Sequence, residues 1–255
     1  MPFPANYKAP RTADGKPDLN GIWQALTTAN WDIQDHPASK GVGTETIGVY
    51  GAQPGGLGIV EGNEIPYQPW ALAKKNENFE KRLNSDPSDR SVGDPEAKCY
   101  MPGLPRATYL PYPFQIIQGT DTILIGYEFA DTPRVVYFDD IGPPPVDSWM
   151  GQSVGRFVGD SLEITVTGFN DQTWFDRAGN FHSEQLKVVE RFTPVSPYHL
   201  NYEATIEDPK VFTRPWKVSF PLYRRMEKGA RLLEFKCVEF SEEFLYGKLR
   251  RQQGK

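Results

Sequence analysis

The sequence predicts a mainly β protein: an antiparallel up-and-down barrel or a strongly curled sheet, with a long irregular N-terminal arm and one helix. From about residue 112 onward, short β-branched and aromatic runs follow one another, separated by turn residues and by no helical pattern. Several runs alternate apolar and polar residues, which gives a sheet one dry face and one solvated face. The 15 Phe, 12 Tyr and 6 Trp among the 255 residues also suit a sheet.

The N-terminal arm, up to about residue 66, contains many prolines and glycines and few runs typical of strands. Tryptophans interrupt it at Trp23 and Trp31. Leaving these side chains in water would be unfavourable, so we expect the arm to pack against the domain as a strap or lid. One short strand is predicted within the arm, near Gly21–Ala25.

One helix is predicted from Pro69 to about Asn84, because a proline at a first helical position has no N–H to leave unpaired. Ser85-Asp86-Pro87 is expected to end it. Its partial apolar stripe consists of Trp70, Leu72, Ala73, Phe79 and Leu83. The chain therefore divides into an arm with this helix (about 69–84) packed on the barrel (1–111), an antiparallel barrel (112–247) and a basic tail (248–255).

The strands of the barrel are predicted from runs of strand-forming residues. Gly159-Asp160 has the composition of a hairpin turn between two of them. The runs are Phe114–Gln118, Thr122–Phe129, Pro133–Phe138, Arg156–Val158, Leu162–Phe169, Leu186–Thr193, His199–Asp208, Trp216–Arg224 and Arg231–Glu239. The residues predicted to share an apolar face are Leu162, Ile164 and Val166 in one strand, and Leu200, Tyr202, Ala204 and Ile206 in another.

The charge balance argues against several classes of partner. The formal net charge is −5, with 28 basic and 33 acidic residues, and the one basic cluster lies at the C-terminal end. A nucleic-acid-binding protein usually carries a basic stripe, so nucleic acid is not expected as a partner. No apolar run approaches the roughly 20 residues of a membrane-spanning helix, so membrane insertion is not expected. The N-terminal residues contain no apolar leader segment, which predicts a cytoplasmic protein, or a periplasmic or secreted one if a leader has been removed.

No cofactor is expected. His36, His182 and His199 lack the spacing of a metal site, and no phosphate-binding glycine loop or nucleophile-elbow motif occurs. Cys99 and Cys237 are the only cysteines, too few for a zinc cage. They form either one disulfide that closes a long loop or two buried thiols.

Several motifs extend over most of the chain. They are Gly15-x-Pro17-Asp18-Leu19-x-Gly21-x-Trp23, Cys99-x-x-Pro102-Gly103-x-Pro105-Arg106, Met150-Gly151-x-Ser153-Val154-Gly155-Arg156, Gly168-Phe169-Asn170-Asp171-x-Thr173-Trp174-x-Asp176 with His182-Ser183, Glu190-Arg191-Phe192, Thr205-Ile206-Glu207-Asp208-Pro209 and Cys237-x-Glu239. In these motifs the chain resembles an uncharacterised bacterial protein family whose members often carry secretory leaders. It departs from that family in showing no such leader and in its sequence after Glu239. Its strand layout is similar to that of calycin-like (lipocalin) barrels, which implies a pocket for a small apolar ligand.

The stretch Asn170–Asp176, followed by His182, is the first candidate site, because long loops at a barrel mouth are where ligands are handled. Asp176 would orient His182 and His182 would move a proton, while Asn170 and Trp174 would contact the substrate. Alternatively, Asn170 and Asp176 hydrogen-bond their own backbone and Trp174 fills the core.

Charged residues on apolar faces form the second candidate site. Glu190 shares its face with Val188 and Arg191 shares its face with Val189, so a charge goes inside whichever face is buried. Glu239 likewise ends an apolar row. An Arg–Glu pair within the barrel would be either a polar anchor for a ligand or a buried salt bridge at the rim.

Three further residues are weaker candidates. Tyr127 ends a strong strand on the face of Ile123 and Ile125, so its hydroxyl could point into a cavity, although core tyrosines with a satisfied hydroxyl are commoner than catalytic ones. Arg106 and Arg134 could each bind a carboxylate or phenolate of a substrate.

Two hypotheses of function follow. The favoured one is a cofactor-independent enzyme that uses acid–base catalysis, of isomerase, cyclase or lyase type, on an apolar or aromatic small molecule held in a barrel pocket. Its catalytic residues would be Asp176, His182, Tyr127 and Glu239, and its substrate-binding residues Trp174, Asn170, Arg191, Glu190 and Arg106. The other is a non-catalytic, lipocalin-like carrier of a hydrophobic ligand. A third hypothesis makes the arm the dimer element of a homodimer. The enzyme requires Asp176, His182 and one of Glu190, Arg191 or Glu239 to converge on one cavity.

Overall fold

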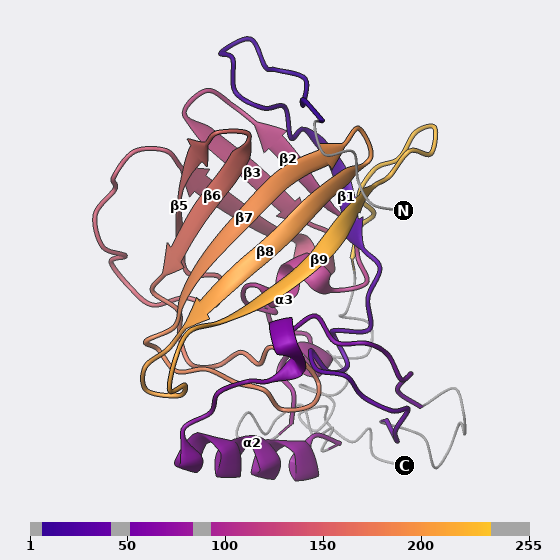
Figure 1. Cartoon of the computed structure of the whole chain (residues 1–255), viewed down its shortest axis with the longest axis vertical. Coiled ribbons are helices and arrows are strands. Elements are labelled where there is room, and N and C mark those ends of the chain that lie inside the picture. Colours follow the sequence, from indigo (N-terminus) through magenta and orange to yellow (C-terminus); the bar gives the residue numbers. More distant parts are fainter. Residues whose placement is uncertain (1–6, 42–51, 84–92, 236–255) are drawn as a thin grey trace, which may run out of the picture.

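Nine strands form a closed barrel in sequence order, from β1 to β9 (Figure 1). The structure, a computed structural model, describes residues 7–41, 52–83 and 93–235. The strands are β1 (Gly21–Ala25), β2 (Phe114–Gln118), β3 (Thr122–Tyr127), β4 (Thr132–Tyr137), β5 (Gln152–Val158), β6 (Ser161–Thr167), β7 (Lys187–Ser196), β8 (His199–Glu207) and β9 (Trp216–Arg224). The predicted fold class, a mainly β and mostly antiparallel barrel of calycin-like type, is confirmed.

One neighbouring pair departs from the predicted antiparallel pattern. Strands β4 and β5 are parallel and share two residue pairs, Val136 with Ser153 and Tyr137 with Val154. A parallel pair needs a crossover connection, and the long loop at residues 138–151 provides it. The other pairings around the barrel are antiparallel.

The arm contributes a strand that closes the barrel. The short strand predicted at Gly21–Ala25 is β1, which pairs with β2 through Trp23 and Phe114 and with β9 through Trp23 and Arg224. The barrel therefore includes part of the arm and does not begin at residue 112. These pairings join residues far apart in sequence, which a local pattern cannot reveal.

The strand predicted at Arg231–Glu239 is wrong over the part that the structure describes, residues 231–235, which contains no strand. Because β1 already pairs with the free edge of β9, the barrel closes without it. The segment instead packs on the outside: the Leu233 N–H donates to Glu128 Oε2 at 2.8 Å, and the Phe235 ring lies 4.7 Å from that of Phe129. Cys237, Glu239 and the basic tail at 248–255 lie outside the described residues.

Side chains fill the interior of the barrel. The apolar rows predicted for β6 and β8 point inward and are buried, as alternation requires. Large inward side chains include Trp23, Phe114, Phe192 and Tyr202, each at most 1% exposed. The barrel is therefore a packed core over these positions, and the polar residues that share it must be paired there.

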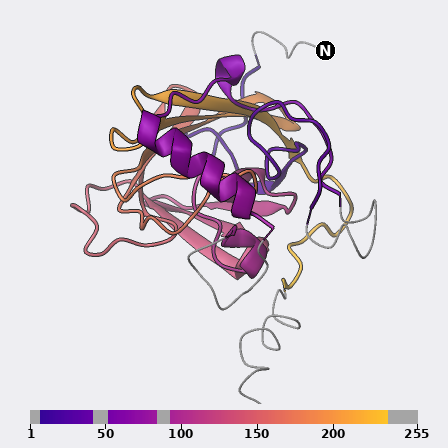
Figure 2. The same cartoon turned by 90° about the horizontal axis from the view of Figure 1, so that it is seen from below.

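Helix α2 (Pro69–Lys81) lies across one end of the barrel (Figures 1 and 2). In the described residues it is the one helix longer than a single turn or so; the shorter ones are η2 (Glu61–Asn63), η3 (Glu96–Lys98), α3 (Arg106–Tyr109) and η4 (Phe129–Asp131). None of the helices in the described ranges is long and apolar enough to span a membrane.

The predicted apolar stripe of this helix is wrong. Its buried residues are Ala71 and Asn78, whereas Trp70 and Leu72 are 50% and 48% exposed. The helix approaches the loop beneath it closely, because Asn78 Nδ2 donates to the carbonyl of Gly179 at 3.2 Å. Small and polar side chains permit that approach, and larger apolar ones turn away from it.

Replacing Gly179 tests this contact. Gly179 has φ of +87°, and a Cβ placed there would lie 2.7 Å from Asn78 Cβ and 2.9 Å from the backbone N of Phe79. Gly179→Ala should therefore lower the free energy of unfolding by more than the ~1–2 kcal/mol that a positive φ alone costs. Gly142→Ala is the matched control, since Gly142 has φ of +71° and no atom lies within 4 Å of the position that its Cβ would take. Equal losses in urea denaturation would contradict the close contact.

Candidate functional site

Asp176 is completely enclosed by donors from its own loop and from the arm. Its Oδ1 accepts the N–H of Ala178 at 2.9 Å and that of Asn180 at 3.2 Å. Its Oδ2 accepts the N–H of Ile33 at 2.9 Å and the side-chain amide of Asn180 at 2.6 Å. Burial, together with the nearby charge of Asp32, raises the pKa of Asp176 to about 7, although the hydrogen bonds oppose both effects. The carboxyl group fixes the loop and presents no surface to a ligand.

His182 is also held on both sides of its ring. Nδ1 lies 2.9 Å from the carbonyl oxygen of Ser183, so Nδ1 carries the proton and donates it there. Nε2 then accepts the hydroxyl of Thr173 at 2.5 Å. Burial lowers the pKa of His182, and this favours the neutral imidazole that these two contacts need.

The predicted Asp176–His182 pair is therefore wrong. The oxygens of Asp176 are taken by Ile33, Ala178 and Asn180, and no hydrogen bond joins the two predicted partners in the described part of the loop. The carboxylates that act on the charge of His182 are those of Asp208 and Asp171. The alternative prediction, in which Asp176 bonds to its own backbone, describes what is found.

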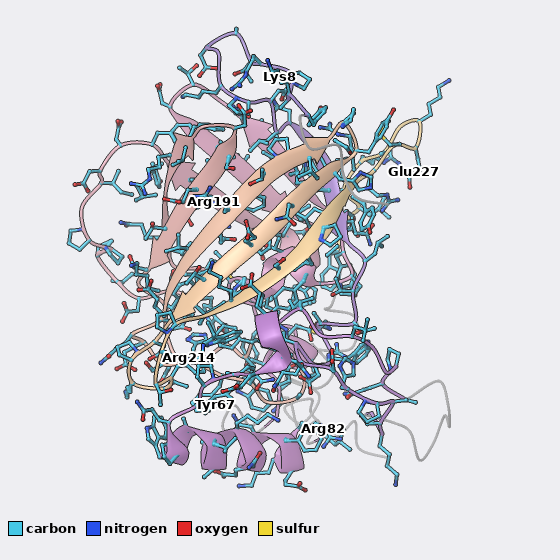
Figure 3. All side chains as sticks on the ribbon, viewed as in Figure 1. Lys8, Tyr67, Arg82, Arg191, Arg214 and Glu227 are labelled. Atoms are coloured by element: carbon cyan, nitrogen blue, oxygen red, sulfur yellow. The ribbon has the colours of Figure 1, made fainter. Side chains whose placement is uncertain are left out.

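Asn170 and Trp174 separate in the same loop. Asn170 accepts the N–H of Gln172 at 3.2 Å and so stabilises a turn, again as its alternative prediction describes. Trp174 forms a β-bridge with Phe181, and this pairing brings both ends of the loop together beside α2. Tyr67, labelled in Figure 3 between α2 and the barrel, donates its hydroxyl to Asn180 at 2.8 Å.

Arg106 is 1% exposed and uses all its N–H groups within the protein. Nε donates to Asn30 at 3.0 Å, and Nη1 donates to the carbonyl of Trp174 at 3.2 Å. The guanidinium also binds Asp94 in a bidentate pair, at 2.8 and 2.6 Å, and reaches Glu96 at 3.1 Å. Arg106 is thus committed to structure, and the substrate carboxylate proposed for it is replaced by two carboxylates of the chain.

The second candidate site lies inside the barrel, with Arg134 as the partner of Glu190. The two side chains are 4% and 0% exposed, and both Nη atoms of Arg134 donate to the carboxylate. Tyr202 donates its hydroxyl to Glu190 at 2.7 Å. Arg134 further donates to Ser153 at 2.9 Å and to the Tyr127 hydroxyl at 3.2 Å. Burial raises the pKa of Tyr202 well above its ordinary value, and the carboxylate raises it further, so the phenol remains a donor.

This interior cluster is a salt bridge whose members satisfy one another. Tyr127 also contacts the Thr108 hydroxyl, at 3.4 Å, and burial raises its pKa too. Arg191 points the other way, onto the outer face, where it donates to Glu163 at 3.0 Å; Figure 3 shows it on the outside of β7. Glu190 and Arg191 therefore do not share a site, because neighbouring residues of a strand face opposite sides.

The residues that do converge line a cleft at the α2 end of the barrel, with a volume of about 710 Å³. Trp70, Lys74 and Asn78 form one wall, since residues four apart share a helix face. The opposite wall holds Tyr100 and Trp149, whose rings are 5.3 Å apart and 3° from parallel. The loop residues on the cleft are Asp171, Gln172, Trp174, Phe181, His182, Ser183 and Glu184, and Lys98 and Lys210 complete its polar rim.

Of the predicted site residues, Trp174 and His182 line this cleft, while Asp176, Asn170, Arg106, Glu190, Arg191 and Tyr127 do not. The sequence reasoning missed Trp70, Tyr100 and Trp149, which supply most of the aromatic surface. Their only signal was the high aromatic content outside the strands. Within the described ranges, no group of three or more His, Cys, Asp or Glu side chains is arranged to hold a metal ion.

Comparisons of the chain with protein-family models, with curated proteins and with solved structures find no match.

The interior salt bridge can be tested by a double-mutant cycle. Glu190→Gln leaves the buried guanidinium of Arg134 without its counter-charge, and we expect a loss of roughly 3–5 kcal/mol in the free energy of unfolding. Arg134→Met combined with Glu190→Gln should be less destabilising than the sum of the single changes, because no unpaired charge remains. Strict additivity in urea denaturation would contradict the pairing.

The pKa of His182 gives a pH dependence with a definite sign. Burial lowers this pKa below 6.5, so the unfolded chain takes up a proton at a higher pH than the folded chain does. Stability from the neutral ring is therefore complete above about pH 6.5 and is lost as the pH falls below that value. Between pH 7 and pH 5, the wild type should lose more free energy of unfolding than His182→Gln. Parallel pH profiles would show that the folded ring is not shifted.

Proposed function

We propose that this protein binds a small molecule with an aromatic or apolar ring in the cleft at the α2 end of its barrel. The observation that carries the proposal is the convergence of five aromatic side chains from separate segments on one cavity of about 710 Å³. Cavities of roughly 300–1,000 Å³ with aromatic walls and a few polar groups are typical ligand sites.

The exposure of these rings supports binding. Trp70 is 50% exposed, and its ring lies 6.1 Å from that of Phe181 across the cleft, in an edge-on arrangement. Tyr100 and Trp149 are stacked on each other and half-buried. A planar ligand placed against such surfaces would remove apolar area from water at little cost in side-chain entropy, because aromatic side chains have few rotamers.

The proposal places the ligand at the mouth of the barrel, outside the interior. The inward positions are filled by side chains such as Phe192 and Tyr202, and the charged pair Arg134–Glu190 is satisfied there. Polar groups on the cleft rim, among them Asp171 and Gln172, lie where they can orient a ligand's polar atoms. This is the carrier hypothesis with its pocket moved.

Acid–base catalysis is the second candidate, and the position of His182 in the wall of the cleft favours it. The neutral imidazole has its tautomer fixed by the Ser183 carbonyl, which is one requirement of a general base. The Thr173 hydroxyl occupies Nε2 and would have to rotate away before that nitrogen could take a proton from a substrate. Catalysis would then use His182 with Thr173, without Asp176.

A dye that fluoresces in apolar surroundings tests the cleft. Anilinonaphthalene sulfonate should bind the wild type, and Trp149→Ala should weaken binding roughly tenfold, since a lost stacking partner costs on the order of 1 kcal/mol or more. Tyr198→Ala is the control, because Tyr198 is 51% exposed and lies outside the cleft. Equal affinities of wild type, Trp70→Ala and Trp149→Ala would refute the site.

A further inference from the structure

A second surface lies where β4 and β5 separate. Their ladder ends at Val136 and Ser153, so Thr132–Val135 of β4 have no register partner on β5. A groove of about 330 Å³ runs beside this part of β4, and we call it the seam groove. Its apolar lining comes from Pro133, Val135 and Tyr137 of β4 and from Pro144, Pro145, Val146 and Met150 of the facing loop, which Figure 1 shows projecting beside β5.

The outer face of the sheet continues this apolar surface. Ile117, Leu124 and Val135 are direct neighbours across β2, β3 and β4, and they are 48%, 39% and 39% exposed. Val146, on the facing loop, is 72% exposed. Contiguous exposed apolar residues of this kind mark interaction surfaces, because isolated ones are normal but rows of them are not.

Carboxylates surround the same surface. Between residues 112 and 155 the sequence contains Asp121, Glu128, Asp131, Asp139, Asp140 and Asp147. All of the aspartates in this set are exposed. Asp131 immediately precedes β4, and Asp139 and Asp140 follow it closely, so both ends of the strand are acidic. The one basic residue of this range is Arg134, whose charge is already paired with Glu190 inside the barrel.

We propose that the seam groove binds an extended, basic peptide segment of another protein, which adds to the free part of β4 as a further strand. The open strand edge would supply main-chain hydrogen bonds, the groove would take the apolar side chains of one face, and the carboxylates would pair with basic side chains of the segment. A second copy of this chain is a poorer occupant, because two acidic rims would face each other.

A fluorescently labelled, end-capped peptide of alternating lysine and valine tests the proposal by anisotropy. It should bind the wild type with an affinity that falls as salt is added, and a peptide of alternating glutamate and valine should not bind. Asp139→Lys should weaken binding roughly tenfold or more. Glu61→Lys makes the same charge reversal on an exposed residue of η2, outside the groove, and should leave the affinity unchanged.

The strand-addition part is tested by N-methylation. Two versions of the lysine–valine peptide, each methylated at alternate backbone nitrogens, lose the N–H donors of opposite edges. One of the two should fail to bind, because strand addition uses one edge of the peptide. The proposal is overturned if Asp139→Lys binds as tightly as the wild type, or if both methylated peptides bind as well as the parent.

Discussion

The guanidinium of Arg106 holds together the end of the barrel on which the cleft is built. It donates to Asn30 of the arm, to Asp94 and Glu96, and to the carbonyl of Trp174. Three segments distant in sequence therefore meet at one buried cation, and removing it would leave two carboxylates unpaired in the core. The planar, five-donor geometry of arginine is required, since a lysine has only three donors and no fork.

Two smaller anchors complete this arrangement. Asp176 fixes the loop that carries Trp174 and Phe181, and Asn78 fixes α2 on that loop through Gly179. The cleft walls thus rest on buried polar contacts, while the aromatic rings remain partly exposed. Such preorganisation lowers the entropy that binding must overcome, so a cleft of modest size can hold a ligand without large rearrangement.

The barrel was predictable from sequence where alternation was strong. Leu162–Val166 and Leu200–Ile206 read as half-buried strands because side chains alternate with a period of two. The closure by β1 was not predictable, since five residues with one tryptophan give no information on their partners. The stripe of α2 failed for a related reason: close contact with Gly179 selects Ala71 and Asn78, and that contact depends on tertiary structure. Trp174 and His182 were predicted because loops at a barrel mouth concentrate function.

Glu190 shows how far a local argument extends and where it stops. Its place on an apolar row correctly implies a buried charge that needs a partner, because an unpaired carboxylate would be far too costly in the core. Sequence adjacency suggested Arg191, yet the same alternation that buries Glu190 puts Arg191 outside. The partner comes from β4, and its side chain lies next to the place where β4 and β5 part. The internal pairing of Arg134 keeps that cation away from the surface, and the seam groove is acidic as a result.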